Sequence, residues 1–437
     1  MRLNPVLIGS SEDAFHHGRP IHIVPDARRR HLAVFGGSGS GKSTLFRNML
    51  AGDIAAGHGV TVVDPHGQLV EELLDNHIPR RRTNDVIYFN PKDQEHAFAL
   101  NMLDCRRPDQ RGLVVSNVIG IFKKLWADSW GPRMEDLLRN GLYALIEQLS
   151  PVSILALPKL LSDQAYRTQV LRNVRNPAVL DFFHNTYARW DNRFREEAIS
   201  PVLNKCRAFT TDPLLRAIIG QTRSSFDFRR AMDARKIILC DLSKGAIGAD
   251  NAMLLGSLIV MQEKLAALSR SDIPESERVP HLLFAEEAQN FIGDFESILA
   301  ETRKYNLVLA VATQGIESLS RETAAAIFTN AANLIAFRVS NTDAERLRDE
   351  FTMVFPGAII QDLPDYQAWV RTLTCDDHGC RPAEPEQVAT YPPSTGDPGT
   401  EWRSRIERAS NERYTRPRAA VEAKLKRFLL GGIKERE

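Results

Sequence analysis

The residues from Gly36 to Thr44 have the types and spacing of a phosphate-binding loop, G-x-x-x-x-G-K-S, between an apolar run and a helix-like pattern. Its glycines allow the tight turns in which backbone N–H groups face phosphate oxygens. Lys42 is expected to reach the β- and γ-phosphates, and Ser43 to bind magnesium through its hydroxyl. The preceding strand-like run argues against a chance glycine turn. The predicted nucleotide-binding residues are Gly36, Gly37, Ser38, Gly39, Ser40, Gly41, Lys42, Ser43 and Thr44.

Two glutamates, Glu286 and Glu287, follow a second apolar run, Leu282–Ala285, which His281 precedes. Such a run predicts a buried strand, whose C-terminal end delivers both carboxylates beside the phosphate loop. We expect Glu286 to hold magnesium and Glu287 to polarise the attacking water. The alternative is a strand that ends in a solvated acidic turn.

Three further polar residues are candidates for the same site. Gln314 follows the apolar run 307–312, where it either senses the γ-phosphate or caps a helix. Arg303 either neutralises charge on a neighbouring subunit's nucleotide or pairs with a local acid such as Glu301. Asp64 lies near the metal or in a simple turn. The predicted catalytic residues are Glu287, Glu286, Lys42, Gln314 and Arg303, and the predicted metal ligands are Ser43 and Glu286.

The elements that position these residues alternate between strand and helix, which favours an α/β fold with a mostly parallel, helix-covered sheet. The expected strands are 32–35, 60–63, 86–89, 237–240, 282–285, 307–312, 334–337 and 368–373. The expected helices are 43–56, 69–74, 252–268, 295–304, 324–331 and 343–351. Residues 1–30 read as irregular.

The middle of the chain breaks this alternation, because its apolar residues have helical spacing and strand patterns are nearly absent. We therefore expect an all-helical insertion at 107–230. The nucleotide-binding domain is expected to comprise 1–106 and 231–391. A Pro- and Gly-rich linker and a basic helical tail occupy 392–437.

The composition of the 437 residues is that of a globular protein, with 43% hydrophobic and 25% charged residues and a net charge of +1. Residues 402–437 are different, because they hold eleven Lys and Arg against five Glu. Such a tail either meets nucleic acid or forms a solvated helix.

The sequence also bears on location and redox chemistry. No apolar run approaches the roughly 20 residues needed to span a bilayer, so we expect a cytoplasmic protein. The five cysteines are too few and scattered for a disulfide framework. Cys375 and Cys380 flank what looks like a plain hairpin turn, for which a zinc site would need further ligands.

Taken together, these residues resemble the RecA-like motor ATPases of the FtsK/HerA superfamily, and most closely the type IV coupling proteins of conjugation, of the TraG/TraD type. The phosphate loop is generic. An ordered set is much more specific to this family: the glutamates followed by Ala-Gln-Asn-Phe, then Arg303-Lys304-Tyr305, and then the strand that ends in Gln314. The matching stretches are Arg30–Gly36 leading into the loop, Val60–Gly67, Asp85–Pro91, Leu100–Leu103, Ser129–Glu135, Leu282–Phe291, Glu301–Tyr305, Ala312–Gln314 and Ser410–Tyr414.

The resemblance implies a RecA-like P-loop NTPase that uses ATP and Mg²⁺ and works as a hexameric ring threading DNA through a central channel. It implies Lys42 and Ser43 for nucleotide and magnesium, and Gln314 as a γ-phosphate-linked glutamine. Arg303, and with it Arg30, falls where the family places intersubunit arginines. The helical insertion resembles the all-alpha domain at the channel mouth. Two features depart from the family: Glu286 stands where Asp is usual, and no N-terminal transmembrane helices are apparent.

We therefore expect an ATP-driven DNA translocase that acts in conjugative transfer through type IV secretion. It grips single- or double-stranded DNA without reading sequence. Trp130 either stacks on bases or is buried. One alternative is a HerA-like end-processing helicase partnered with a nuclease. The other is a nucleotide-switched docking protein for secretion substrates. Further expected partners are a relaxase and a membrane-anchored secretion component that recruits the protein to the inner membrane.

Overall fold

The computed structural model describes residues 3–13, 16–291, 295–351, 360–396 and 400–431. The chain divides into two compact units. Unit 1 comprises Met1–Phe89 and Phe228–Ser410, and unit 2 comprises Asn90–Asp227 and Asn411–Glu437. In this division the middle segment begins at Asn90 rather than at 107, and it forms one unit with the C-terminal tail.

Unit 1 is built on a sheet that has 11 strands over the described residues, in the order β2-β1-β14-β11-β10-β3-β9-β8-β4-β7-β5. The seven strands from β10 to β5 are parallel. Their bounds are β3 Leu32–Phe35, β4 Gly59–Asp64, β5 Val86–Phe89, β7 Ile237–Asp241, β8 His281–Ala285, β9 Leu307–Thr313 and β10 Asn333–Ala336. Each is buried along its whole length, which explains the continuous apolar runs.

The other four strands of the sheet are antiparallel. They are β1 Val6–Ser11, β2 Pro20–Ile23, β11 Gln367–Arg371 and β14 Glu386–Thr390. The expectation that residues 1–30 are irregular is thus wrong, because this segment supplies β1, β2 and the short helix α1 Pro25–Arg28. These strands alternate buried and exposed side chains, a pattern too short and too polar to stand out in the sequence.

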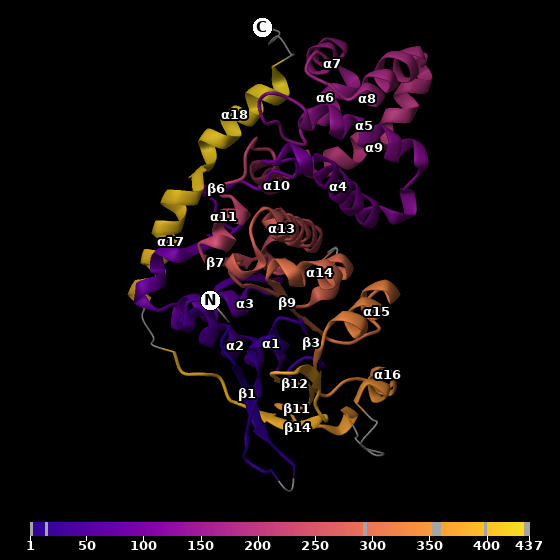
Figure 1. The fold of residues 1–437 in the computed structure, drawn as a ribbon. Coiled ribbons are helices and arrows are strands. Elements are labelled where there is room, and N and C mark those ends of the chain that lie inside the picture. The colour runs from indigo at the N-terminus through magenta and orange to yellow at the C-terminus, as the bar shows by residue number, and fades with distance from the viewer. Residues whose placement is uncertain (1–2, 14–15, 292–294, 352–359, 397–399, 432–437) are drawn as a thin grey trace. The chain divides into compact units, whose positions relative to one another are not determined.

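Helices cover both faces of the parallel strands (Figure 1). On one face, Phe46 of α2 meets Phe284 of β8 edge to face at 5.1 Å between ring centroids. On the other, Phe35 of β3 stacks on Phe328 of α15 at 5.8 Å. The helices of unit 1 are α2 Lys42–Ala56, α3 Gln68–Asn76, α11 Phe228–Asp233, α12 Lys244–Ile247, α13 Ala249–Ser269, α14 Phe295–Glu301, α15 Arg321–Asn330 and α16 Asn341–Phe351.

The longest of these helices, α13, changes one expectation. By length and composition the helical stretch Ala249–Asp272 is apolar enough to cross a membrane, although the sequence suggested no such run. However, 83% of its apolar window is buried inside the protein. A core helix passes the same test, so this stretch is weak evidence for a membrane span.

The cysteine pair lies in a hairpin, as expected, formed by β12 Leu373–Asp376 and β13 Gly379–Pro382. The structure joins Cys375 and Cys380 in a disulfide, which the sequence did not predict. The two residues are direct cross-strand partners in the hairpin, so their side chains lie close enough to bond. Among the described residues no cluster of potential metal ligands is found.

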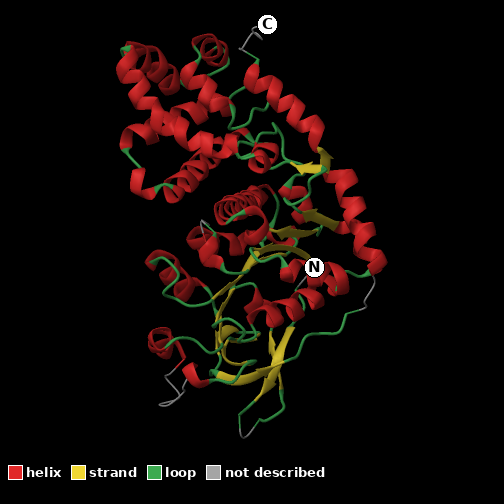
Figure 2. Ribbon diagram, turned by 180° about the vertical axis from the view of Figure 1, so that it is seen from behind, coloured by secondary structure: helices red, strands yellow, loops and turns green. Residues whose placement is uncertain are grey.

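Unit 2 is mainly helical (Figure 2). Its helices are α4 Arg111–Leu125, α5 Pro132–Ile146, α6 Ala156–Ser162, α7 Gln164–Leu171, α8 Pro177–Asp181, α9 Asn192–Thr211, α10 Pro213–Ile219 and α18 Arg418–Leu430. Two short strands, β6 His96–Phe98 and β15 Thr415–Pro417, pair antiparallel. Helix α17 runs Thr400–Tyr414, and residues 392–396 of the expected linker form no helix or strand.

Candidate functional site: the phosphate loop and its carboxylates

The phosphate loop connects the C-terminal end of β3 to the N-terminus of α2, as the sequence predicted. Gly39 and Gly41 have φ of 75° and 120°, a region that glycine enters without strain. At Gly36 a side chain would collide with its surroundings, because an added Cβ would lie 2.6 Å from Ser40 Oγ and 2.8 Å from Phe337 Cβ. The loop backbone therefore needs glycine at these positions.

The N-terminus of α2 presents its first N–H groups without a side-chain cap. The first turn of a helix carries partial positive charge, and its amides have no partner within the helix. Lys42, the first residue of α2, is buried, and its Nζ donates to the carbonyl oxygens of Gly36 at 2.6 Å and Gly37 at 3.0 Å. Loop, helix end and ammonium thus form a cationic site of the kind that binds phosphates.

Glu286 and Glu287 follow β8 and are 6% and 8% exposed. Burial, and after it the neighbouring carboxylate of Asp64, raises the pKa of Glu286 to about 7. A hydrogen bond from the Ser43 side chain to Glu286 opposes this shift. The two predicted metal ligands, Ser43 and Glu286, are therefore in direct contact.

Glu287 is fixed by a chain of side-chain contacts. Its backbone is left-handed, with φ of 49°, and Gln289 Nε2 donates to its carboxylate. Thr313 Oγ1, at the end of β9, donates in turn to Gln289 Oε1 at 2.9 Å. Burial lowers the pKa of Lys42, while Glu287 and Glu286 oppose the shift. The lysine of the loop thus lies within the electrostatic field of both glutamates.

Gln314 lies at the same edge of the sheet as the loop. It is exposed and directly follows Thr313, whose carbonyl accepts a hydrogen bond from Gly36 N at 3.2 Å. The register of β3 against β9, which pairs Phe35 with Thr313, fixes this proximity.

Arg303 is not brought to this edge. It precedes β9, at the amino end of the parallel strands, together with Arg29 and Arg30, which precede β3. Partial desolvation lowers the pKa of Arg303, and the charges of Arg30 and Arg29 lower it further, whereas Glu275 and Asp26 oppose the shift. The three arginines therefore lie at the amino ends of the parallel strands, and the phosphate loop lies at their carboxyl ends.

Asp64 and Trp130 have local partners. The Asp64 carboxylate accepts hydrogen bonds from His66 N at 2.8 Å and Val70 N at 3.2 Å, so it organises the turn into α3. Trp130, in unit 2, is half-buried, and its Nε1 donates to Glu135 at 2.9 Å.

Sequence reasoning missed Lys244 as a neighbour of the site. Its pKa is lowered by burial and raised by Glu287, so the ammonium lies near that carboxylate. Lys244 begins α12, soon after β7, and no motif in the sequence links it to the glutamates. The role of Thr313 in holding Gln289 was also unseen.

Two family models match the chain. Residues 20–124 match "Helicase HerA, central domain", and residues 280–350 match "TraM recognition site of TraD and TraG". The first range contains the phosphate loop, and the second contains both glutamates, Arg303 and Gln314. No curated protein matches the chain.

Solved structures of a bacterial conjugative coupling protein, TrwB, match nearly the whole chain. The unbound monoclinic form is 16% identical, covers 91% of both chains and has a TM-score of 0.61. The complex with a non-hydrolysable ATP analogue is 18% identical, covers 92% of both chains and has a TM-score of 0.60. A further TrwB structure contains ADP and Mg²⁺.

The resemblance to coupling proteins is confirmed. The predicted fold class, a RecA-like α/β fold, is also confirmed. At these identities the TrwB structures establish the fold, whereas the family matches connect the sequence itself to HerA-type and TraG/TraD-type proteins.

Proposed function

We propose that the chain is an ATPase motor of the coupling-protein type, which hydrolyses ATP with Mg²⁺ to move DNA through a hexameric ring. The observation that carries this proposal is the convergence of Lys42, Ser43, Glu286 and Glu287 at one edge of the parallel sheet. The match to TrwB over 91% of both chains supports the coupling-protein type.

The residues present fit a nucleoside triphosphate with Mg²⁺. The uncapped amides of α2 and the glycines of the loop suit phosphate oxygens, and Lys42 supplies a cation. Glu286 is a buried carboxyl already bonded to the Ser43 hydroxyl, and this pair of oxygen ligands suits a hard cation. When bound, Mg²⁺ neutralises charge on the phosphate oxygens.

Each side chain then has a distinct task. Lys42 leaves the loop carbonyls to bind the β- and γ-phosphates, while Ser43 and Glu286 hold the metal. Glu287, fixed by Gln289, orients a water molecule and accepts its proton. Gln314, at the end of β9, contacts the γ-phosphate. Loss of this phosphate removes the contact and so affects the strand.

The test is ATP turnover by the purified full chain, measured with and without single- and double-stranded DNA. We expect turnover that depends on Mg²⁺ and rises with DNA, and native mass spectrometry should detect a hexamer. A protein that binds ATP but shows no turnover with either DNA would contradict the motor. Such a result would favour a nucleotide-switched docking protein.

A second candidate, a HerA-like DNA end-processing helicase, is favoured by the match of residues 20–124 to the HerA central domain. This function requires a nuclease partner. Copurification of a nuclease from cells that express a tagged chain, with DNA unwinding from ends, would favour it. Copurification of a relaxase or of a membrane-anchored secretion protein would favour the coupling function.

We also propose that the protein works in the cytoplasm and is recruited to the inner membrane by such a partner. Fractionation of cells with and without the secretion components tests this proposal. The chain should move from the soluble to the membrane fraction only when the partner is present.

A further inference from the structure

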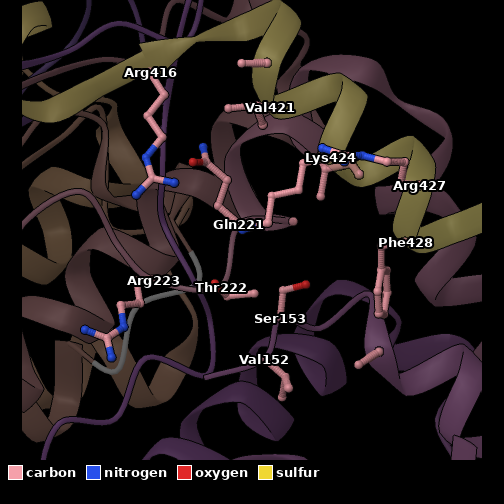
Figure 3. Close-up of a pocket in the computed structure, with 14 residues that line it drawn as sticks. Val152, Ser153, Gln221, Thr222, Arg223, Arg416, Val421, Lys424, Arg427 and Phe428 are labelled. Carbon is pink, nitrogen blue, oxygen red and sulfur yellow. The ribbon is translucent and has the colours of Figure 1, made fainter. Parts of the chain in front are cut away.

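A cavity of about 430 Å³ lies within unit 2, away from every residue assigned above (Figure 3). One wall is the C-terminal helix α18, and the other is the segment 220–223 that follows α10, together with 152–156 before and in α6. This volume lies in the range of pockets that hold small ligands.

Four cationic side chains line the cavity: Arg223, Arg416, Lys424 and Arg427. No carboxylate belongs to its lining among the described residues. Arg223, Arg416 and Lys424 are exposed, and within the described part of the chain they form no ion pair. Glu422, on the same helix as Lys424, is instead paired with Arg216 at 3.0 Å. The cavity therefore carries an uncompensated positive charge.

The rest of the lining is both polar and apolar. Thr222 and Ser153 supply two hydroxyls, and Gln221 supplies an amide oxygen, because its amide nitrogen already donates to the carbonyls of Phe98 and Ala217. Val421, Leu425 and Phe428 supply apolar surface. In Figure 3 the guanidinium groups of Arg223 and Arg416 lie on one side and the ring of Phe428 on the other, with the Ser153 hydroxyl directed into the space between them.

The walls of the cavity are held in place by the fold. Strand β15, which carries Arg416, pairs with β6. Gly220 allows α18 to approach closely, because a Cβ there would lie 3.1 Å from Leu425 Cδ2 and closer still to Leu155. Lys159 donates to the Phe428 carbonyl and lies 4.5 Å from the centre of its ring. The site is therefore formed before any ligand arrives, which lowers the entropic cost of binding.

We propose that this cavity binds a nucleoside phosphate unit, supplied either as a free nucleotide or by a single strand of nucleic acid. Arginine guanidinium groups match phosphate oxygens in two-pronged hydrogen bonds. A base has an apolar face that suits Phe428 and a polar edge that suits the amide and hydroxyls. An acidic peptide would match the cations but has no flat aromatic face to stack on Phe428.

The test uses the full chain with its phosphate loop saturated by a non-hydrolysable ATP analogue, so that no probe binds in that loop. The variants described below then distinguish the cavity from the DNA path of the motor. Fluorescence anisotropy follows a fluorescein-labelled oligo(dT) strand. Unlabelled thymidine monophosphate and a polyglutamate peptide serve as competitors. Competition by the mononucleotide indicates a free nucleotide as the ligand, whereas binding of the strand alone indicates nucleic acid.

Two matched pairs of variants locate the binding. Arg223→Gln with Arg416→Gln should weaken binding by about tenfold or more and reduce the salt dependence by about 0.7 for each lost phosphate contact. Arg175→Gln with Arg193→Gln removes the same charge from exposed positions of unit 2 outside the cavity and should change neither.

The second pair tests the cavity rather than its charge. Ala420→Trp fills the cavity from an exposed lining position, whereas Ala419→Trp adds the same ring beside it. Only the first should weaken binding of the strand to the extent that the arginine pair does. Equal binding by all variants would overturn the proposal, as would displacement of the strand by polyglutamate without competition from thymidine monophosphate. Both outcomes are independent of ATP turnover, so they are distinguishable from failure of the proposed motor.

Discussion

At the scale of single residues, the contacts of Glu287 separate binding from chemistry. Its carboxylate is held by Gln289 and lies near two lysines, so its removal should leave the phosphate loop intact. We expect Glu287→Gln to bind ATP normally and to lose at least about 10²-fold in turnover, because the group that takes the proton from water is gone. Steady-state turnover and binding of a fluorescent ATP analogue check this.

Lys42→Ala should behave differently, because its ammonium is the cation that meets the phosphates. Both nucleotide affinity and turnover should fall, and circular dichroism should show an unchanged fold.

The matched control for Glu287→Gln is Glu322→Gln, which makes the same chemical change on the exposed side of α15. This variant should leave nucleotide affinity and turnover unchanged. Substantial turnover by Glu287→Gln would remove this residue from the mechanism.

A second residue-scale prediction concerns His31, which is 1% exposed and accepts a hydrogen bond from Leu309 N at 3.0 Å. Burial lowers its pKa from 6.5 to about 4. The unfolded chain therefore binds a proton between these values that the folded chain does not. Stability should fall as the pH decreases from 6.5, by at most about 1.4 kcal/mol for each pH unit.

His31→Asn isolates this contribution. Its backbone has φ of 64°, a left-handed conformation that Asn adopts readily, and the Asn side-chain oxygen can accept the same hydrogen bond. We expect the free energy of unfolding to depend less on pH in the variant than in the wild type. Urea unfolding at about pH 7.5, 6.5 and 5.5 checks this, because these values span the titration. Parallel pH dependences in the two proteins would contradict the assignment.

At the scale of elements, we expect replacement of glycine by alanine to have opposite effects on stability at two positions, Gly9 and Gly52. Gly9 of β1 approaches β14 so closely that an added Cβ would lie 2.1 Å from the carbonyl oxygen of Ala389. Gly9→Ala should therefore destabilise the protein, by about 1–3 kcal/mol. Gly52, exposed within α2, has open space around it, so Gly52→Ala should stabilise by about 0.5–1 kcal/mol.

Urea unfolding of both variants beside the wild type checks this pair. Gly52→Ala serves as the control for Gly9→Ala, because the two share the same chemical change. If Gly9→Ala were as stable as the wild type, the close pairing of β1 with β14 would be wrong.

The elements also explain how far the sequence could lead. Strands such as β4 and β8 were predictable because parallel strands covered on both faces read as continuous apolar runs. Strands β1 and β14 were not, because each has a partly exposed face. The proximity of Lys42 and Glu286 was also predictable, because each follows the carboxyl end of a parallel strand and these ends lie at the same edge of the sheet. The approach of Lys244 depends on the strand order β8-β4-β7, which no local pattern encodes.

At the scale of the whole molecule, the position of Arg303 bears on assembly. It precedes β9, whereas the phosphate loop lies at the other end of the parallel strands. A strand of 7 residues is roughly 20 Å long, well beyond the reach of an arginine side chain. Arg303 therefore cannot serve the nucleotide of its own subunit. In an oligomer it is free to serve that of a neighbour.

This geometry predicts complementation between two inactive proteins. Arg303→Ala and Lys42→Ala should each lose turnover when alone. In mixed oligomers, a subunit with Arg303→Ala supplies an intact phosphate loop, and a neighbour with Lys42→Ala supplies the arginine, so some interfaces regain both groups. ATP turnover measured after mixing in different ratios should pass through a maximum. If Arg303 acted within its own subunit, every mixture would stay inactive, because no chain would carry a complete site.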